Sequence, residues 1–324
     1  MGRIDDILAG KNSVGITGHI RPDGDCAGSC LGLYNYIRVN YPEIFVKLYL
    51  EPLPQKFLFL PGAESVDSSY GDESDFDIFI VLDTSDHERM GKSVKYFAGA
   101  SATLAVDHHI SNELFAEENI LIPDASSTAE VLYGLLDPDR LNKDMATCLY
   151  TGIIFDSGVF KYSNTSQKTM NIAGKLISYG IDFTKIIDNS FYASTYKQNR
   201  IMGRALLDSK LVFGDICIYS LVTRDIMDQY GVNSSDLDGI VEQLRNTTGV
   251  ECALFVYELE DGTFKASLRS SEYLDVNKVA QQFGGGGHVR AAGCSLKGPA
   301  DFAIRKILGV IAGELSYEWN SERI

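Results

Sequence analysis

Short apolar runs alternate with helical patterns over the first 180 residues of the chain. The runs of strand length lie at residues 13–18, 44–50, 76–83, 102–107 and 119–124. The segments between them repeat their apolar positions at helical spacing. Strands that are apolar throughout and separated by helices are typical of a parallel sheet covered on both faces. The pattern therefore predicts a doubly wound α/β fold for this half.

Helix-start and helix-stop signals support this interpretation. Ser127 and Glu130 have capping-box spacing before an apolar helical segment, and Pro138 is predicted to close that helix. Farther along, residues 190–208 show helical spacing with polar residues interleaved, and a new strand pattern opens near Gly214. We interpret residues 190–208 as a helix that connects two domains.

The remainder of the chain predicts a smaller, mixed α+β domain. Strand patterns lie at residues 215–222, 250–260 and 262–270, and Asp261–Gly262 between the last two is a strong hairpin signal. An amphipathic helical stretch, Pro299–Trp319, follows them.

At 324 residues and 45% hydrophobic composition, the chain has enough material for two packed cores. We therefore expect a first domain at residues 1–190, a connecting helix at 191–213 and a second domain at 214–324.

The composition limits which partners we expect the protein to bind and in which compartment we expect to find it. The chain carries 29 basic and 44 acidic residues, so its formal net charge is −15. Binding long duplex nucleic acid needs a basic face, and so acidic a chain is not expected to have one. Long duplex nucleic acid is therefore excluded as a partner, whereas a short anion held by a few groups is not. The charged N-terminal segment does not resemble a signal peptide, and no apolar run reaches the length of a membrane span. We expect a soluble, cytoplasmic protein without a membrane partner.

The six cysteines are spread along the chain without a CxxC pair, and several lie inside apolar stretches. Such residues are typically the reduced, buried thiols of a cytosolic protein. A metal site made by Cys26 and Cys30 is the less favoured alternative.

The first cluster of candidate site residues follows the first predicted strand directly. His19, Asp23 and Asp25 lie there, where Pro22 prevents a helix and Gly24 allows a sharp turn. Two positions apart in an extended segment, the two carboxylates can point the same way. A solvated turn has the same composition, so this cluster alone does not decide between a turn and a metal site.

Three further groups of candidate site residues each lie at the end of an apolar run. Asp83 follows one strand, Asp107, His108 and His109 follow another, and Asp156 ends a helical apolar pattern. Ligands of open parallel sheets bind outside the carboxyl ends of the strands, so these side chains are expected to converge. Asp156 by itself is equally well explained as a helix cap.

Convergence of these groups predicts bound metal ions. Five carboxylates and three imidazoles in one crevice would repel one another and be costly to desolvate without cations. Imidazole mixed with carboxylate suits Mn, Fe, Co or Zn better than Mg or Ca. Two ions about 3.5–4 Å apart, bridged by one carboxylate, could use nearly all of these ligands. The pattern therefore predicts two-metal hydrolysis of a phosphate ester.

The same motifs resemble those of the DHH phosphoesterases, a family named for the triplet that stands here at Asp107, His108 and His109. "GHIRPDGD", "VLDTSD", "VDHH" and "GIIFDSGVF" are similar to its first four elements, and the resemblance covers nearly the whole chain. It implies two Mn²⁺ ions, with Co²⁺ or Mg²⁺ as substitutes. The implied ligands are His19, Asp23 and Asp83 for one ion and Asp25, Asp83, His108 and Asp156 for the other.

The resemblance also implies catalytic roles. Asp83 would bridge the ions, His109 would face the substrate phosphate or polarise a bridging water, and Asp107 would orient a histidine. Ser157 stands where threonine is commoner in the family, and the hydroxyl is retained.

The second half adds the glycine-rich segment "FGGGGHVRAAG" and, upstream of it, "SLRS". Glycines let backbone N–H groups approach an anion, and a guanidinium suits phosphate, although a flexible loop is the alternative for the glycines. Together the segments resemble the DHH-associated substrate-binding domain. The implied substrate-binding residues are Arg269, Ser270, Gly285, Gly286, Gly287 and His288.

Within the family, this combination resembles the branch that degrades very short RNA oligomers and dephosphorylates adenosine 3′,5′-bisphosphate, through in-line attack by a metal-bridging hydroxide. The main alternative is a phosphodiesterase of cyclic dinucleotides or linear dinucleotides. An inorganic pyrophosphatase is less favoured because of the glycine-rich segment, and a non-catalytic nucleotide sensor because every ligand position is filled. The sequence leaves open the direction of digestion and whether the chain forms a homodimer.

Overall fold

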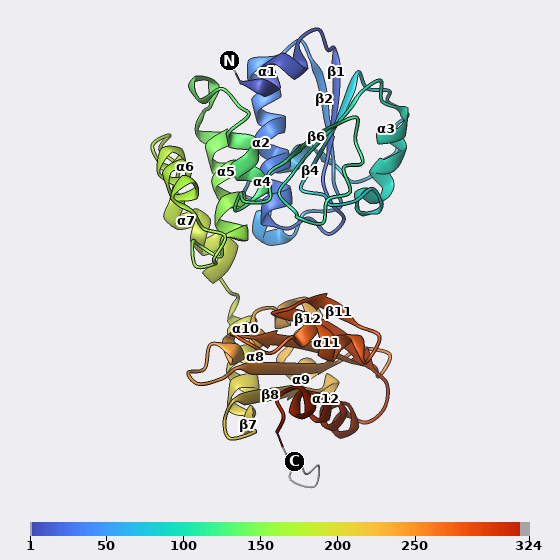
Figure 1. Ribbon diagram of the computed structural model, residues 1–324, viewed down its shortest axis with the longest axis vertical. Coiled ribbons are helices and arrows are strands. Elements are labelled where there is room, and N and C mark those ends of the chain that lie inside the picture. The colour runs from blue at the N-terminus through green and yellow to red at the C-terminus, as the bar shows by residue number, and fades with distance from the viewer. Residues whose placement is uncertain (1, 318–324) are drawn as a thin grey trace. The chain divides into compact units, whose positions relative to one another are not determined.

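A computed structural model describes residues 2–317 (Figure 1). The chain divides into two compact units between Ala193 and Ser194. Among the described residues, no helix combines the length and the apolar character needed to cross a membrane.

The first unit contains a six-stranded parallel sheet, which confirms the predicted fold class. Its strands are β1 (Ser13–Thr17), β2 (Phe45–Tyr49), β3 (Val66–Asp67), β4 (Ile78–Leu82), β5 (Thr103–Asp107) and β6 (Glu118–Leu121). Each predicted run overlaps one strand, and β3 is the addition. Two residues are too few to produce a recognisable pattern of alternation.

The strand order, β3-β2-β1-β4-β5-β6, reverses direction between β1 and β4. From β1 the chain moves outward to β3, returns to place β4 beside β1, and then moves outward the other way. Loops after the central strands therefore diverge and leave a crevice at their carboxyl ends. The segments after β1, β4 and β5 meet at that edge.

Helices cover both faces of this sheet, with α2, α4 and α5 on one side and α3 on the other (Figure 1). Their bounds are α1 (Arg3–Leu8), α2 (Gly24–Asn40), α3 (Val94–Gly99), α4 (Thr128–Tyr133), α5 (Lys143–Asp156), α6 (Gln167–Ile177) and α7 (Phe183–Ile187). Short helical turns lie at Gln55–Phe57, Ala63–Ser65, Glu88–Ser93, Pro138–Arg140 and Asp188–Tyr192. Helix α2 packs closely on α5. A Cβ added to Gly28 would lie only 2.5 Å from the carbonyl oxygen of Cys148, so this position has room for glycine alone.

The second unit contains a mixed sheet of order β11-β12-β10-β9-β8-β7, in which only β8 and β9 pair in parallel. Its strands are β7 (Lys210–Val212), β8 (Cys217–Val222), β9 (Cys252–Glu258), β10 (Phe264–Ser270), β11 (Gly286–His288) and β12 (Ala291–Leu296). The predicted hairpin joins β9 and β10, and Gly262 adopts φ 75° in its turn. Such a positive φ costs glycine little.

Helices pack on both faces of this sheet as well. They are α8 (Tyr196–Leu207), α9 (Arg224–Tyr230), α10 (Ile240–Arg245), α11 (Val276–Gln281) and α12 (Ala300–Glu314), with a short turn at Ser234–Leu237. Ile201 and Ala205 of α8 are fully buried in the core of the second unit. The segment interpreted as a connecting helix thus contributes its helix to the second unit. Helix α12 lies in the predicted amphipathic stretch, whose last residue, Trp319, is outside the described residues.

Candidate metal centre

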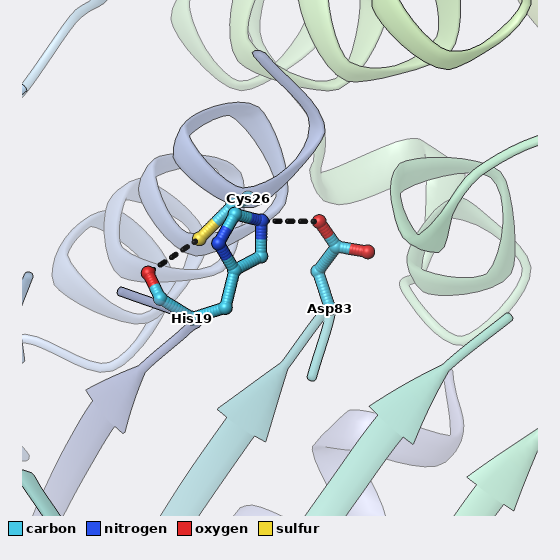
Figure 2. A group of neighbouring side chains, drawn as sticks. All are labelled: His19, Cys26 and Asp83. Carbon is cyan, nitrogen blue, oxygen red and sulfur yellow. Dashed lines mark hydrogen bonds and ion pairs between the residues drawn. The ribbon is translucent and has the colours of Figure 1, made fainter. Parts of the chain in front are cut away.

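His19 follows β1 and is almost fully buried. Its Nδ1 lies 2.8 Å from the carbonyl oxygen of Ile20, so Nδ1 carries the proton and donates it there. Nε2 then faces two carboxylates. Nε2 lies 3.5 Å from Oδ2 of Asp83 and 3.7 Å from Oδ2 of Asp23. Figure 2 shows His19 and Asp83 facing each other at the ends of their strands.

The structure corrects the expected geometry of Asp23 and Asp25. The two are not in an extended segment, because α2 begins at Gly24 and Asp23 is its N-cap. Oδ1 of Asp23 accepts hydrogen bonds from the backbone N–H groups of Asp25 and Cys26. The first turn of a helix leaves such N–H groups without partners, and an aspartate at the cap supplies one. The two carboxylates therefore point to different neighbours.

Asp25 is fully buried and faces the start of α4. Its two carboxylate oxygens accept hydrogen bonds from the backbone N–H groups of Thr128, at 2.6 Å, and Ala129, at 3.0 Å. The side chain of Ser127 accepts the N–H of Glu130, as the capping signal predicts. The capping signal predicts free N–H groups at the start of α4, but no sequence pattern indicates that they would bind Asp25.

Asp83 lies directly after β4, in the left-handed region at φ 57°. Its Oδ2 faces His19, and its Oδ1 lies 3.8 Å from Nε2 of His108. The hydroxyl of Thr128 donates a hydrogen bond to Oδ1 at 2.9 Å. One carboxylate thus presents one oxygen to each of two histidines, which is the arrangement that a bridging ligand requires. Thr128 was missed by sequence reasoning, because its partner is 45 residues away in the chain.

His108 follows β5, with its Nε2 among three carboxylates. Nε2 lies 3.1 Å from Oδ2 of Asp156 at the end of α5, 3.8 Å from Asp83 and 4.0 Å from Asp25. Within residues 2–317, this buried nitrogen makes no hydrogen bond of good geometry, and its 3.1 Å contact with Asp156 is an ion pair. Three carboxylates around one imidazole nitrogen are costly to bury unless positive charge, from a proton on Nε2 or from a cation, lies among them. The donor set therefore fits a divalent metal ion.

Asp107 holds the second histidine of the triplet. Its Oδ1 lies 2.8 Å from Nδ1 of His109, and its Oδ2 accepts a hydrogen bond from Nδ2 of Asn112 at 2.7 Å. Asp107 is buried, whereas about a third of the His109 side chain is exposed. A carboxylate in this position can fix the orientation of the imidazole ring. Asn112, a second partner of this carboxylate, was missed by sequence reasoning.

The electrostatics of the site show how poorly it tolerates its own negative charge. Burial raises the pKa of Asp25 well above its ordinary value, and repulsion from Asp83 and Asp156 raises it further. Burial likewise raises the pKa of Asp156 to about 6. Burial would lower the pKa of His108, but the surrounding carboxylates, Asp156 and Asp83 above all, outweigh it and raise that pKa to about 9. The carboxylates therefore recruit positive charge, which divalent cations would supply.

In the second unit, the structure places Arg269 and His288 in one row. Arg269 of β10 and His288 of β11 are both register partners of Ala291 on β12. Residues directly opposite one another project from the same face of a sheet, and neighbouring strands lie about 4.8 Å apart. The two side chains thus share one face, with backbones about 10 Å apart. Arg269 also lies 3.7 Å from Glu242, measured from Nε to Oε2.

The glycine-rich segment forms an edge strand, where a flexible loop was the alternative. A Cβ on Gly285 would lie 2.2 Å from the carbonyl oxygen of Gly293, and one on Gly287 would lie 2.4 Å from that of Ala291. Glycine at these positions lets the edge strand, which includes Gly286, approach β12. Ser270 is buried and donates its hydroxyl to the carbonyl oxygen of Leu274.

Because neighbouring residues of a strand point to opposite faces, Ser270 faces away from the Arg269 row. We therefore leave Ser270 out of the proposed substrate contacts.

Family comparison agrees with the division into two units. The N-terminal domain of the DHH family matches residues 13–153, and the DHHA1 domain matches residues 214–315. The chain belongs to the DHH family. As a DHH phosphoesterase, it is an enzyme that hydrolyses phosphoric esters. The matched N-terminal segment contains every proposed metal ligand except Asp156, which lies three residues beyond it.

Two relatives and one solved structure match most of this chain. The bifunctional oligoribonuclease and PAP phosphatase NrnA of Thermus thermophilus is 29% identical over 315 residues, which cover 96% of this chain and 92% of that protein. The uncharacterized protein MG371 homolog of Mycoplasma pneumoniae is 30% identical over 282 residues, covering 85% and 83%. The crystal structure of an exopolyphosphatase-related protein from Bacteroides fragilis has a TM-score of 0.86 at 25% identity, covering 96% and 94%.

Replacing Thr128 with valine tests the support that Asp83 receives from α4. Thr128→Val keeps the shape of the side chain and the backbone N–H that binds Asp25, but removes the hydroxyl that donates to Asp83. Loss of a hydrogen bond that orients a metal ligand typically costs 10- to 100-fold in metal affinity or activity. We expect a loss of about that size in kcat/KM, with weaker metal binding by titration calorimetry.

Thr147→Val is the matched control, since among the described residues the hydroxyl of Thr147 bonds only the carbonyl of Lys143 within α5. Equal behaviour of the two variants would show that the Thr128 hydroxyl does not orient Asp83.

Proposed function

We propose that this DHH phosphoesterase uses two Mn²⁺ ions, with Co²⁺ or Mg²⁺ as substitutes, to hydrolyse short oligoribonucleotides and adenosine 3′,5′-bisphosphate. The observation that carries the two-metal proposal is the placement of Asp83, whose two oxygens face His19 on one side and His108 on the other. A carboxylate that serves two ions at once would have this placement.

The proposed ligands fall into two groups that share one residue. His19 and Asp23 would hold one ion with Asp83, and the ligands of the other would be Asp25, Asp83, His108 and Asp156. The histidine nitrogens lie 3.1–4.0 Å from the carboxylate oxygens of their groups. When bound, such ions polarise a phosphoryl oxygen and make a water molecule more acidic.

His109 is the residue proposed to contact the reacting phosphate. Its hydrogen bond to Asp107 raises the pKa of His109 and fixes the ring through Nδ1, so Nε2 is left for the substrate. A protonated imidazole can donate from Nε2 to a phosphoryl oxygen as negative charge develops there. Its partial exposure suits a group that meets a substrate from solvent.

Substrate selection is assigned to the second unit. Arg269 and His288 share a face of the sheet, and a guanidinium and an imidazole are both suited to phosphate or base. The name of the Thermus thermophilus relative supports oligoribonucleotides and adenosine 3′,5′-bisphosphate as substrates. The net charge of −15 supports short substrates, because the chain lacks the excess of cations that long nucleic acids require.

Arg269→Ala tests this assignment. We expect KM for 5′-phosphorylated di- to tetranucleotides to rise about 10- to 100-fold, since a hydrogen bond to a charged group contributes about 1.5–3 kcal/mol. KM for a small chromogenic phosphodiester should change little, because that substrate has no second phosphate to bind. Steady-state kinetics with both substrates give the comparison.

Arg305→Ala is the control, since Arg305 is an exposed arginine on α12. Equal increases for both substrates in Arg269→Ala would reject the assignment.

A substrate panel tests the function as a whole. The Mn²⁺-supplemented enzyme is assayed with di- to pentanucleotides, adenosine 3′,5′-bisphosphate, cyclic dinucleotides and pyrophosphate, and kcat/KM is compared. We expect the short oligomers and the bisphosphate to rank first. A cyclic dinucleotide or pyrophosphate in first place would contradict the proposal and identify the alternative.

A further inference from the structure

Cys26 lies beside the proposed ligands of the first ion, although the proposed function gives it no role. The residue is in the first turn of α2 and is fully buried. Its Sγ lies 3.8 Å from the backbone oxygen of His19. Figure 2 shows the sulfur next to the His19 ring, with Asp83 facing the same ring.

These three residues together offer a mixed donor set. One ligand atom from each of His19, Cys26 and Asp83 lies within 4.8 Å of the other two, and all three residues are buried. Imidazole nitrogen, sulfur and carboxylate oxygen are the ligand types that proteins use to bind Zn²⁺. All six cysteines are free and buried, as predicted, but Cys26 is the one that shares such a group within residues 2–317.

Asp23 and Cys26 are alternative third ligands at this position. Asp23 is the more exposed, with 39% of its side chain accessible, and one of its oxygens already caps α2. A hard ion such as Mn²⁺ favours the carboxylate oxygen of Asp23. A thiophilic ion favours the sulfur of Cys26.

We propose that this position also binds thiophilic divalent cations, Zn²⁺ or Cd²⁺, through Cys26 together with His19 and Asp83. The inference rests on the proposed function only in taking His19 and Asp83 as metal ligands. Ligand atoms around one tetrahedral ion lie roughly 3.4–3.7 Å apart, so the three atoms must close by about 1 Å.

Coordination by the sulfur has a defined proton balance and a functional consequence. As the metal–sulfur bond forms, the S–H bond breaks and its proton passes to solvent, so that the ligand is a thiolate. A thiolate-bound ion would occupy His19 and Asp83 and exclude the Mn²⁺ that the proposed function places there. Zn²⁺ and Cd²⁺ are therefore expected to inhibit Mn²⁺-supported hydrolysis.

Cadmium absorption is the direct test, because a cadmium–thiolate bond gives an intense charge-transfer band in the ultraviolet that nitrogen and oxygen ligands do not. We expect the metal-free full chain to develop this band on titration with Cd²⁺, and Cys26→Ser to lose it. Cys30→Ser, one turn farther along α2, is the matched control and should keep the band. Absence of the band in the wild type, or its persistence in Cys26→Ser, would overturn the inference.

Inhibition by Cd²⁺ gives a second readout, in which each variant is normalised to its own Mn²⁺-supported rate. The Cd²⁺ concentration for half-inhibition should rise at least about tenfold in Cys26→Ser, and an unchanged value would count against Cys26. Cys26→Ala replaces Cys26→Ser in both experiments if circular dichroism shows that the serine variant is unfolded. A wild type with the cadmium–thiolate band but without Mn²⁺-supported hydrolysis would reject the proposed function alone, and hydrolysis without the band would reject only the role of Cys26.

Discussion

Asp83→Asn is expected to lower kcat/KM for short oligoribonucleotides by at least about a thousandfold, or about 4 kcal/mol of transition-state stabilisation. Asp83 is nearly fully buried and presents one oxygen to His19 and the other to His108. An amide has one oxygen and no charge, so the variant cannot serve two cations at once. Steady-state kinetics at saturating Mn²⁺ measure the loss.

Asparagine is the informative replacement because of the backbone at this position. Asp83 adopts φ 57°, a conformation that asparagine and aspartate accept more readily than alanine does. The amide oxygen can still accept the hydrogen bond that Thr128 donates. Loss of activity in a variant whose melting temperature matches that of the metal-free wild type would therefore reflect lost metal binding and not a lost fold.

Glu113→Gln is the matched control, an acid-to-amide change at an exposed residue near the DHH triplet. Its activity should stay within about twofold of wild type. An Asp83→Asn enzyme that retained near wild-type turnover would reject the bridging role.

Removal of metal is expected to abolish hydrolysis and to lower the thermal stability of the first unit. Without cations, Asp25 and its neighbouring carboxylates repel one another in a buried site. A ligand present at 100 times its Kd stabilises the folded state by about 2.7 kcal/mol per site. Adding Mn²⁺ to the chelated protein should therefore raise its melting temperature by several degrees and restore activity.

The rise in melting temperature on adding Mn²⁺ should be larger at pH 8 than at pH 6. The pKa of His108 is raised to about 9 in the absence of metal, so a proton must leave Nε2 before an ion can bind there. Lowering the pH adds protons that compete for His108 and weakens metal binding. Raising the pH strengthens metal binding. Differential scanning fluorimetry at both pH values measures the change, and a rise that did not depend on pH would show that His108 is not a ligand.

The fold was largely predictable because its strands are buried on both faces. Residues such as Ile80 of β4 and Leu104 of β5 are fully buried, and a strand with two covered faces must be apolar at every position. The reversal of strand order between β1 and β4 left no such pattern, because it depends on which strands pair. The two-residue strand β3 was missed for lack of length.

The candidate site was predictable in its residue types and less so in its geometry. His19, Asp83 and His108 were found because polar residues that end apolar strands gather at one edge of a parallel sheet. The expected geometry of Asp23 and Asp25 was wrong, because the N–H groups of α2 take one oxygen of Asp23 as their cap.

By itself the sequence determined most of the central strands, where the chemistry-bearing side chains stand along the chain, and that they belong to a DHH phosphoesterase; it did not show the short or edge strands β3, β7, β11 and β12. Hydrophobic periodicity and short motifs are local properties, so one chain is enough to show them. Only the tertiary structure decided that α4 supports Asp25 and Asp83, that Asn112 binds Asp107, and that Cys26 meets the His19 site. No sequence pattern marks those contacts, because packing within the first unit brings the residues together.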